Sequence, residues 1–178
     1  MLQLNESFYR RKVSQIQARL EHEGLDGILL LEVHNVIYAS GFFHIPSERP
    51  LGMYIPKSGE PALFVPLLEL ENASAVWIGD IRTYFEYPGE EHPVVWMVRE
   101  TGAVHLGVDT LTVDVFRKVG GSVIVTPFVE QMRWVKEPEE IALVEKAATY
   151  ADYCLEVVRD QAADIVRGGG TELDILKA

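Results

Sequence analysis

The sequence predicts an α/β fold in which a mixed, largely parallel sheet carries helices on both faces and is followed by a long helix. Short apolar runs bounded by glycine or other turn residues alternate with segments of helical periodicity, which is typical of a sheet covered on both sides. Two of these runs are separated by only a short turn, which adds an antiparallel pair. After Pro138, apolar residues recur at helical spacing as far as Leu155.

Residues 5–22 have the pattern of an amphipathic helix. Asn5 or Ser7 can cap its start, and Gly24 can end it, because glycine readily adopts the left-handed conformation found at helix ends. The expected buried side of this helix consists of Phe8, Val13, Ile16 and Leu20.

The middle of the chain predicts further strands and helices. Residues 51–55 and 62–66 are expected to pair as a hairpin, because a turn containing glycine and proline lies between them. The other expected elements are a buried strand at 25–31, a helical turn or loop at 35–41, a helix at 67–76, a strand at 81–85, a helix at 93–99, a strand at 104–108, a helix at 112–119 and a strand at 122–126.

The long helix begins at Pro138, since proline is well tolerated in a first helical turn and two glutamates follow it there. Its periodic apolar residues are Ile141, Val144, Ala148, Ala151 and Leu155. The glycines at 168–170 stop this helix, and a new helix start follows them. We therefore expect one domain at residues 1–128, and at 129–178 a linker with the first helix or helices of a second domain.

Composition limits the classes of partner. The net charge of −11 and the pI near 4.9 argue against duplex nucleic acid or an anionic membrane as the main partner. No apolar run approaches the roughly 18 residues that a membrane span needs. The single cysteine, Cys154, cannot form an intrachain disulfide, and its place on the long helix predicts a packed side chain. A cytoplasmic location follows from this cysteine usage.

No catalytic or metal-binding pattern stands out in the sequence. The five histidines form no helical pair with a glutamate between them. The glycines at 168–170 lack the lysine of a phosphate-binding loop and follow a helix instead of a strand. We therefore assign no catalytic residue and no metal ligand.

The segment before the hairpin, residues 38–50, is the strongest candidate for binding. Pro50 holds Arg49 in an extended conformation, and a guanidinium so presented can bind a carboxylate through two parallel hydrogen bonds. The alternative is a local ion pair with Glu48, Glu69 or another surface acid.

Three segments in register resemble the creatinase/prolidase/aminopeptidase P family, the M24 metallopeptidases. They are residues 24–30, 35–42 and 132–141. The last contains the start of a signature in which an arginine and a lysine precede a Pro-Glu helix start and a pair of alanines. The residues matching this signature are Arg133, Lys136, Glu140, Ala147 and Ala148.

The resemblance implies a creatinase-like N-terminal domain followed by the start of a "pita-bread" catalytic domain. In that family the catalytic domain binds two divalent metals, which can be Mn, Co or Zn, through two aspartates, a histidine and two glutamates. No residue of this chain matches those ligand motifs. The resemblance therefore implies a fragment that is inactive by itself, because two-metal hydrolysis needs the ions to generate hydroxide.

The resemblance also implies a homodimer in which the N-terminal domain of one subunit borders the active site of the other. Arg49 matches an arginine that binds the substrate carboxylate in creatinase, and His44 and Phe43 are weaker candidates for lining the same pocket. The implied partners are a small peptide or another carboxylate-bearing substrate, with no nucleic acid and no membrane.

The sequence is compatible with two kinds of enzyme and with two other functions. The parent enzyme is expected to be an Xaa-Pro peptidase or a creatinase-like C–N hydrolase. The first alternative is a non-catalytic, peptidase-like interaction module. The second is a plain α/β dimerisation domain, in which Trp77, Trp96 and Met97 are either core or interface residues.

Overall fold

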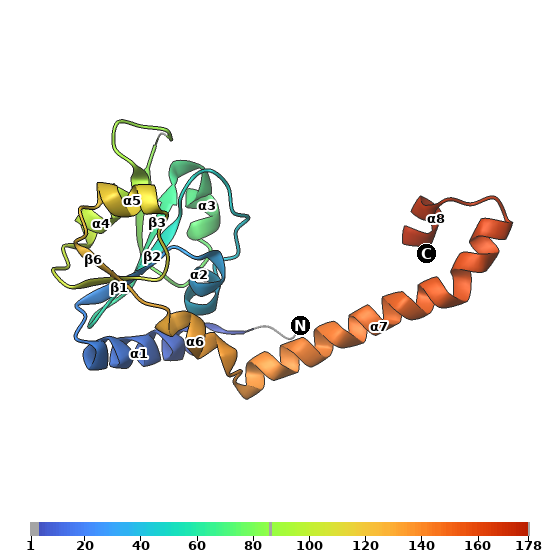
Figure 1. Cartoon of the computed structure of the whole chain (residues 1–178). Coiled ribbons are helices and arrows are strands. Elements are labelled where there is room, and N and C mark those ends of the chain that lie inside the picture. Colours follow the sequence, from blue (N-terminus) through green and yellow to red (C-terminus); the bar gives the residue numbers. More distant parts are fainter. Residues whose placement is uncertain (1–3, 86, 178) are drawn as a thin grey trace. The chain divides into compact units, whose positions relative to one another are not determined.

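The computed structural model describes residues 4–85 and 87–177 (Figure 1). The chain divides into two compact units, Leu4–Val135 and the part from Lys136 on, and each is described by itself.

The first unit is built on a six-stranded sheet with the order β4-β3-β2-β1-β5-β6. The strands are β1 (Gly27–Leu30), β2 (Gly52–Pro56), β3 (Ala62–Pro66), β4 (Asp80–Tyr84), β5 (Leu106–Val108) and β6 (Val123–Val125). β2 is antiparallel to both of its neighbours, whereas the other neighbouring pairs are parallel. All strands except β2 therefore run in the same direction, and the prediction of a mixed, largely parallel sheet is confirmed.

Helices alternate with these strands. They are α1 (Glu6–Glu23), α2 (Val33–Ser40), the 3-10 helix η1 (Leu67–Glu69), α3 (Leu70–Ala73), α4 (Pro93–Thr101), α5 (Val113–Lys118) and α6 (Phe128–Trp134). The ends of α1 are as predicted: the Asn5 side chain accepts a hydrogen bond from the Phe8 amide at 3.0 Å, and Gly24 is left-handed with a φ of 69°. α2 is a full helix, and the helix expected at 67–76 is shorter and begins as 3-10 helix. α6 was not predicted from the sequence.

Both faces of the sheet are covered, because side chains of successive strand residues point to opposite sides. Ile28 and Leu30 of β1 belong to the core beneath α1 and α2, whereas Leu29 between them belongs to the core beneath α4 and α5. Phe64 and Met97 lie in this second core. The predicted buried side of α1 is confirmed, and it also contains Lys12, whose ammonium lies 4.8 Å from the ring centroids of Phe8 and Tyr38.

The loop at residues 41–51 and the segments that follow β1 and β5 lie at one edge of the sheet. The carboxyl ends of β1, β3, β4, β5 and β6 meet there, together with the beginning of the antiparallel strand β2. The loop at residues 41–51, which joins α2 to β2, therefore reaches this edge beside the residues that follow β1 and β5. In open α/β sheets this edge is where ligands usually bind.

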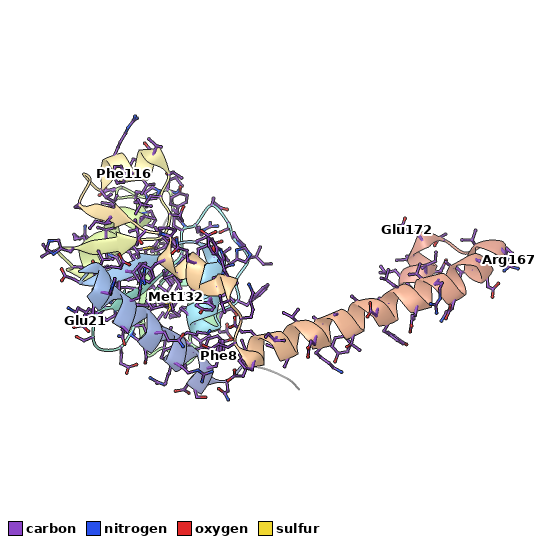
Figure 2. The ribbon with its side chains drawn as sticks, turned by 60° about the horizontal axis from the view of Figure 1, so that its bottom comes forward. Phe8, Glu21, Phe116, Met132, Arg167 and Glu172 are labelled. Atoms are coloured by element: carbon purple, nitrogen blue, oxygen red, sulfur yellow. The ribbon has the colours of Figure 1, made fainter. Side chains whose placement is uncertain are left out.

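The second unit is a helical hairpin of α7 (Pro138–Arg167) and α8 (Glu172–Leu176). Its helix starts are capped by their own side chains: the Glu137 amide donates to Glu140 at 3.0 Å, and the Thr171 amide donates to Asp174 at 2.8 Å. Neither helix has a buried residue, and side chains stand out from the α7 ribbon along its length (Figure 2). The expectation of a packed Cys154 is wrong for the chain as described, since this side chain is exposed.

Candidate functional site

The loop at residues 41–51 begins with a left-handed glycine. Gly41 ends α2 with a φ of 74°, and its amide donates to the Ile37 carbonyl at 2.8 Å. The ring of Tyr9 lies close to Gly41, so that a Cβ at this position would come within 2.6 Å of a ring atom. Only glycine therefore fits the point where the chain leaves α2 for the loop.

We expect Gly41→Ala to lower the free energy of unfolding by about 2 kcal/mol, because the left-handed backbone and the Tyr9 contact both oppose a methyl group. Urea titration followed by tryptophan fluorescence measures this change. Gly79→Ala is the matched control, since a Cβ there meets nothing within 4 Å. Equal stability of the two variants would contradict the packing argument.

The three residues predicted to bind substrate lie on this loop but have different surroundings. Phe43 is 76% exposed. His44 is partly buried and stacks on Phe42 with the ring centroids 5.4 Å apart, and burial lowers the pKa of its imidazole. Arg49 makes an ion pair with Glu48, which is the local pairing that the sequence left open.

Tyr84 ties the loop to the end of β4. Its hydroxyl donates to the Pro50 carbonyl at 2.7 Å, directly after Arg49. Burial raises the pKa of the Tyr84 phenol, so the hydroxyl stays a donor at neutral pH. The Tyr84 ring also contacts Trp96 of α4 with the centroids 6.1 Å apart. The backbone that presents Arg49 is therefore anchored on the core, while its side chain stays at the surface.

A partly buried carboxylate that the sequence analysis did not single out lies further along the same edge. Asp109, directly after β5, accepts hydrogen bonds from the backbone amides of Leu31 at 2.8 Å and Glu32 at 3.1 Å, and from the side-chain amide of Asn35 at 2.9 Å. Burial raises the pKa of Asp109, although these hydrogen bonds act in the opposite direction. The only sequence signal for it was an acid at the end of an apolar run.

Arg133 extends this cluster from α6. Its guanidinium donates to the Asn35 side chain at 2.9 Å and to the Glu32 carboxylate at 3.3 Å. The Glu32 carboxylate also caps α2 by accepting from the Asn35 amide at 2.9 Å. Side chains from the ends of β1 and β5, from α2 and from α6 are thus joined in one hydrogen-bonded cluster, which we call the Asp109 cluster.

The Asp109 cluster borders a polar cavity of about 340 Å³. The cavity lies between the ends of β1 and β5. The helices that follow these two strands cover opposite faces of the sheet, and such a topological switch point is a common ligand site. The contacts of Asp109 nevertheless satisfy it with protein donors, so this carboxylate acts as a structural tie between β1, α2 and β5.

The described residues contain no group of three or more His, Cys, Asp or Glu placed to hold a metal ion. The side chains present in 4–85 and 87–177 therefore do not fit a two-metal centre. No helix within these ranges is long and apolar enough to cross a membrane.

Comparison with known proteins identifies the first unit. The model of the creatinase/prolidase N-terminal domain matches residues 12–135, which is more than half of the chain. The chain belongs to the creatinase/prolidase N-terminal domain family. The match ends at the same residue as the first compact unit, Leu4–Val135.

The curated relatives include several described as uncharacterized peptidases. One from Staphylococcus aureus (strain USA300) is 27% identical over 172 residues, which cover 93% of this chain and 47% of the relative. The chain thus spans about half the length of the curated relatives that it matches.

Solved structures show the same fold in two lengths. The creatinase/prolidase N-terminal domain of an X-Pro dipeptidase from Streptococcus pyogenes is 26% identical, with a TM-score of 0.57, and covers 68% of this chain and 98% of its own. Dipeptidase PepE from Mycobacterium ulcerans is 20% identical, with a TM-score of 0.68, and covers 88% of this chain and 44% of its own. The creatinase-like fold class inferred from the sequence is confirmed.

Proposed function

We infer that this chain forms the N-terminal part of a metal-dependent Xaa-Pro peptidase, or of a creatinase-like C–N hydrolase. The observation that supports this most is the family match over residues 12–135 in a chain about half as long as its peptidase relatives. Two structural relatives that are 26% identical are an X-Pro dipeptidase and a proline dipeptidase, which favours the peptidase over the creatinase-like enzyme.

In this proposal the first unit contributes to substrate access. The loop at 41–51 carries Arg49, His44 and Phe43 at the edge of the sheet where the parallel strands end, and these side chains would line the path of the substrate. The Arg49 guanidinium, whose Nη1 donates to Glu48 Oε1, would exchange Glu48 for the carboxylate of a small peptide, which can accept two parallel hydrogen bonds. A homodimer would bring this loop to the active site of the partner subunit.

In the proposed domain division, residues 129–178 form a linker and the first helix or helices of the catalytic domain, and the part of this linker up to Val135 lies in the first compact unit. Two divalent ions, such as Mn, Co or Zn, would be held by residues outside this chain. A cytoplasmic location belongs to the same proposal, since a lone Cys154 makes no intrachain disulfide.

The native protein decides between this enzyme and a non-catalytic interaction module. Mass spectrometry of the protein purified from its source measures the length of the natural polypeptide. A polypeptide about twice as long that hydrolyses Xaa-Pro dipeptides, and loses this activity with a chelator, supports the enzyme. A natural chain of 20.0 kDa without hydrolysis supports the interaction module.

Arg49→Ala in that native enzyme is expected to raise KM for a carboxylate-bearing substrate by about tenfold or more, with kcat nearly unchanged, because a charge-assisted hydrogen bond is worth about 1.5–3 kcal/mol. Steady-state kinetics measures both constants. Arg99→Ala is the control, since Arg99 forms a surface ion pair with Glu91. Wild-type kinetics in Arg49→Ala would remove this residue from the site.

A further inference from the structure

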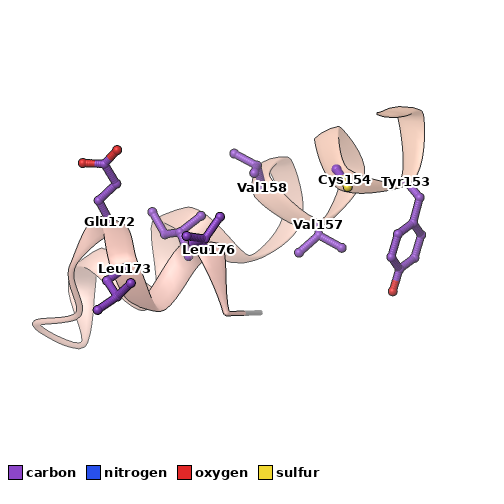
Figure 3. Close-up of a pocket in the computed structure, with 8 residues that line it drawn as sticks. Tyr153, Cys154, Val157, Val158, Glu172, Leu173 and Leu176 are labelled. Atoms are coloured by element: carbon purple, nitrogen blue, oxygen red, sulfur yellow. The ribbon is translucent and has the colours of Figure 1, made fainter. Parts of the chain in front are cut away.

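The two units offer different surroundings to a ligand. In the second unit, a mainly apolar groove of about 590 Å³ lies between α7 and α8, with Val158 of α7 and Leu173 of α8 among its lining residues (Figure 3). Under the proposed function these helices begin the catalytic domain, so this groove belongs to the packing of that domain. The polar group of this chain that is suited to a substrate carboxylate lies in the first unit, where Arg49 is found near the end of the loop at 41–51.

The hydrogen bonds of Arg49 within the described residues reach only its neighbours in the chain. Its amide donates to the Ser47 hydroxyl at 3.2 Å, and its Nη1 donates to Glu48 Oε1. Residues 45–48 are themselves exposed, so these partners do not fix the direction of the guanidinium relative to the sheet. The position of the Arg49 side chain therefore depends on the backbone of residues 49 and 50.

Proline makes this part of the backbone stiff. The ring of Pro50 fixes its own φ, and its Cδ restricts Arg49 to an extended conformation. Few free torsions are left between the Cα of Arg49 and the carbonyl of Pro50. A group that holds this carbonyl therefore also holds the point from which the Arg49 side chain starts.

The Tyr84 hydroxyl is the group that holds the Pro50 carbonyl, at 2.7 Å. Tyr84 is the last residue of β4, where it pairs in register with Pro66 of β3, and its ring contacts Trp96 of α4. The positive charge of Arg49 lowers the pKa of the Tyr84 phenol, but burial has the larger effect and raises this pKa overall. The hydroxyl therefore stays protonated at neutral pH and can donate.

The loop at 41–51 is thus attached to the core at two points. Near its start, Phe42 is 2% exposed and its amide donates to the Ser40 hydroxyl at 2.9 Å. Near its end, the attachment is the hydrogen bond between Tyr84 and Pro50. Loss of this second attachment would leave Phe42 in place and release the part of the loop that carries Arg49.

We propose that Tyr84 is a positioning residue for substrate binding: its hydroxyl holds the Pro50 carbonyl and thereby directs the Arg49 guanidinium toward the carboxylate of a small peptide. This inference rests on the proposed function, and it adds a residue that does not touch the substrate. Because Tyr84 acts through Arg49, its effect on substrate binding should disappear when Arg49 is absent.

Tyr84→Phe in the native enzyme is expected to raise KM for an Xaa-Pro dipeptide by about three- to tenfold with kcat nearly unchanged, since one uncharged hydrogen bond is lost. Tyr54→Phe is the matched control. It removes the same hydroxyl from a tyrosine packed on the same core, but the Tyr54 hydroxyl lies beside Gly27 at the beginning of β1. A rise of KM in Tyr54→Phe as large as that in Tyr84→Phe would assign the effect to the core in general and overturn the proposal.

The double variant Arg49→Ala/Tyr84→Phe tests whether Tyr84 acts through Arg49. Its KM should equal that of Arg49→Ala, because no guanidinium is left to direct. A further rise of KM in the double variant would overturn the positioning role. So would an unchanged KM in Tyr84→Phe when Arg49→Ala raises it, and that result would keep Arg49 in the site.

Failure of the proposed function gives different results. Wild-type kinetics in Arg49→Ala would remove both Arg49 and Tyr84 from the substrate site. A native protein that hydrolyses no Xaa-Pro dipeptide would contradict the proposed function and, with it, the role of Tyr84.

Discussion

Replacing Asp109 with alanine is expected to lower the free energy of unfolding of the first unit by about 3 kcal/mol. The variant leaves the amides of Leu31 and Glu32 and the side chain of Asn35 without their acceptor in a partly buried place, and each unsatisfied buried group costs about 1–3 kcal/mol unless water reaches it. Tryptophan fluorescence in urea measures this unit alone, because all three tryptophans lie before residue 136.

The matched control is Asp114→Ala. Asp114 forms an ion pair with Lys118 on the surface of α5, and such exposed pairs contribute at most about 1 kcal/mol. A loss at Asp109 no larger than that at Asp114 would show that the Asp109 cluster contributes little to stability.

The pH dependence of Asp109→Asn tests the charge separately. Burial raises the pKa of Asp109 in the folded chain above its ordinary value of 3.8, so the folded state binds its proton more tightly than the unfolded state does. The contribution of Asp109 to stability is therefore greatest below that value and declines as the pH rises through the folded pKa. The wild type should therefore exceed Asp109→Asn in free energy of unfolding by less and less as the pH rises from 3.8 through the folded pKa of Asp109. An advantage that grows with pH would mean that the hydrogen bonds outweigh burial.

Local signals explain which elements the sequence could predict. α1 was bounded correctly because Asn5 and Gly24 act through their own neighbours in the chain. The helix predicted at 67–76 was too long, since Trp77 and Ile78 must turn inward to pack on the core before β4 begins. α6 carried no side-chain cap and is held by the burial of Phe128 and Val129, which is a tertiary effect.

The same distinction applies to the candidate sites. The Arg49 loop could be predicted from adjacent residues, because a proline restricts the backbone conformation of the residue directly before it. The Asp109 cluster could not, since its partners lie 74 to 78 residues away in the chain. Arg133 was recognised only as part of a family signature, and its contact with Asn35, 98 residues away, gives that position a structural role.

The Arg49 loop depends on the second core through a series of aromatic contacts. Phe64 lies in β3, packs edge-on against Trp96 with the ring centroids 5.3 Å apart, and is fully buried. Trp96 in turn contacts Tyr84, whose hydroxyl holds the Pro50 carbonyl. A chain of aromatic contacts thus runs from the centre of the second core to the backbone beside Arg49.

Phe64→Ala is therefore expected to have the largest effect on stability, lowering the free energy of unfolding by about 3–5 kcal/mol through lost burial and the cavity left behind. Phe85→Ala is the control, because Phe85 is 78% exposed and its removal should change stability by less than about 0.5 kcal/mol. Urea titration compares the two variants.

The aromatic chain adds a second expectation for the same variant. If Phe64 supports Trp96 and Tyr84, its loss should also speed amide hydrogen exchange in residues 41–51 relative to β1 under native conditions. Tyr84→Phe, which removes only the hydroxyl bonded to Pro50, should loosen the same loop with a much smaller loss of global stability. Unchanged exchange in both variants would show that the loop holds its conformation without this support.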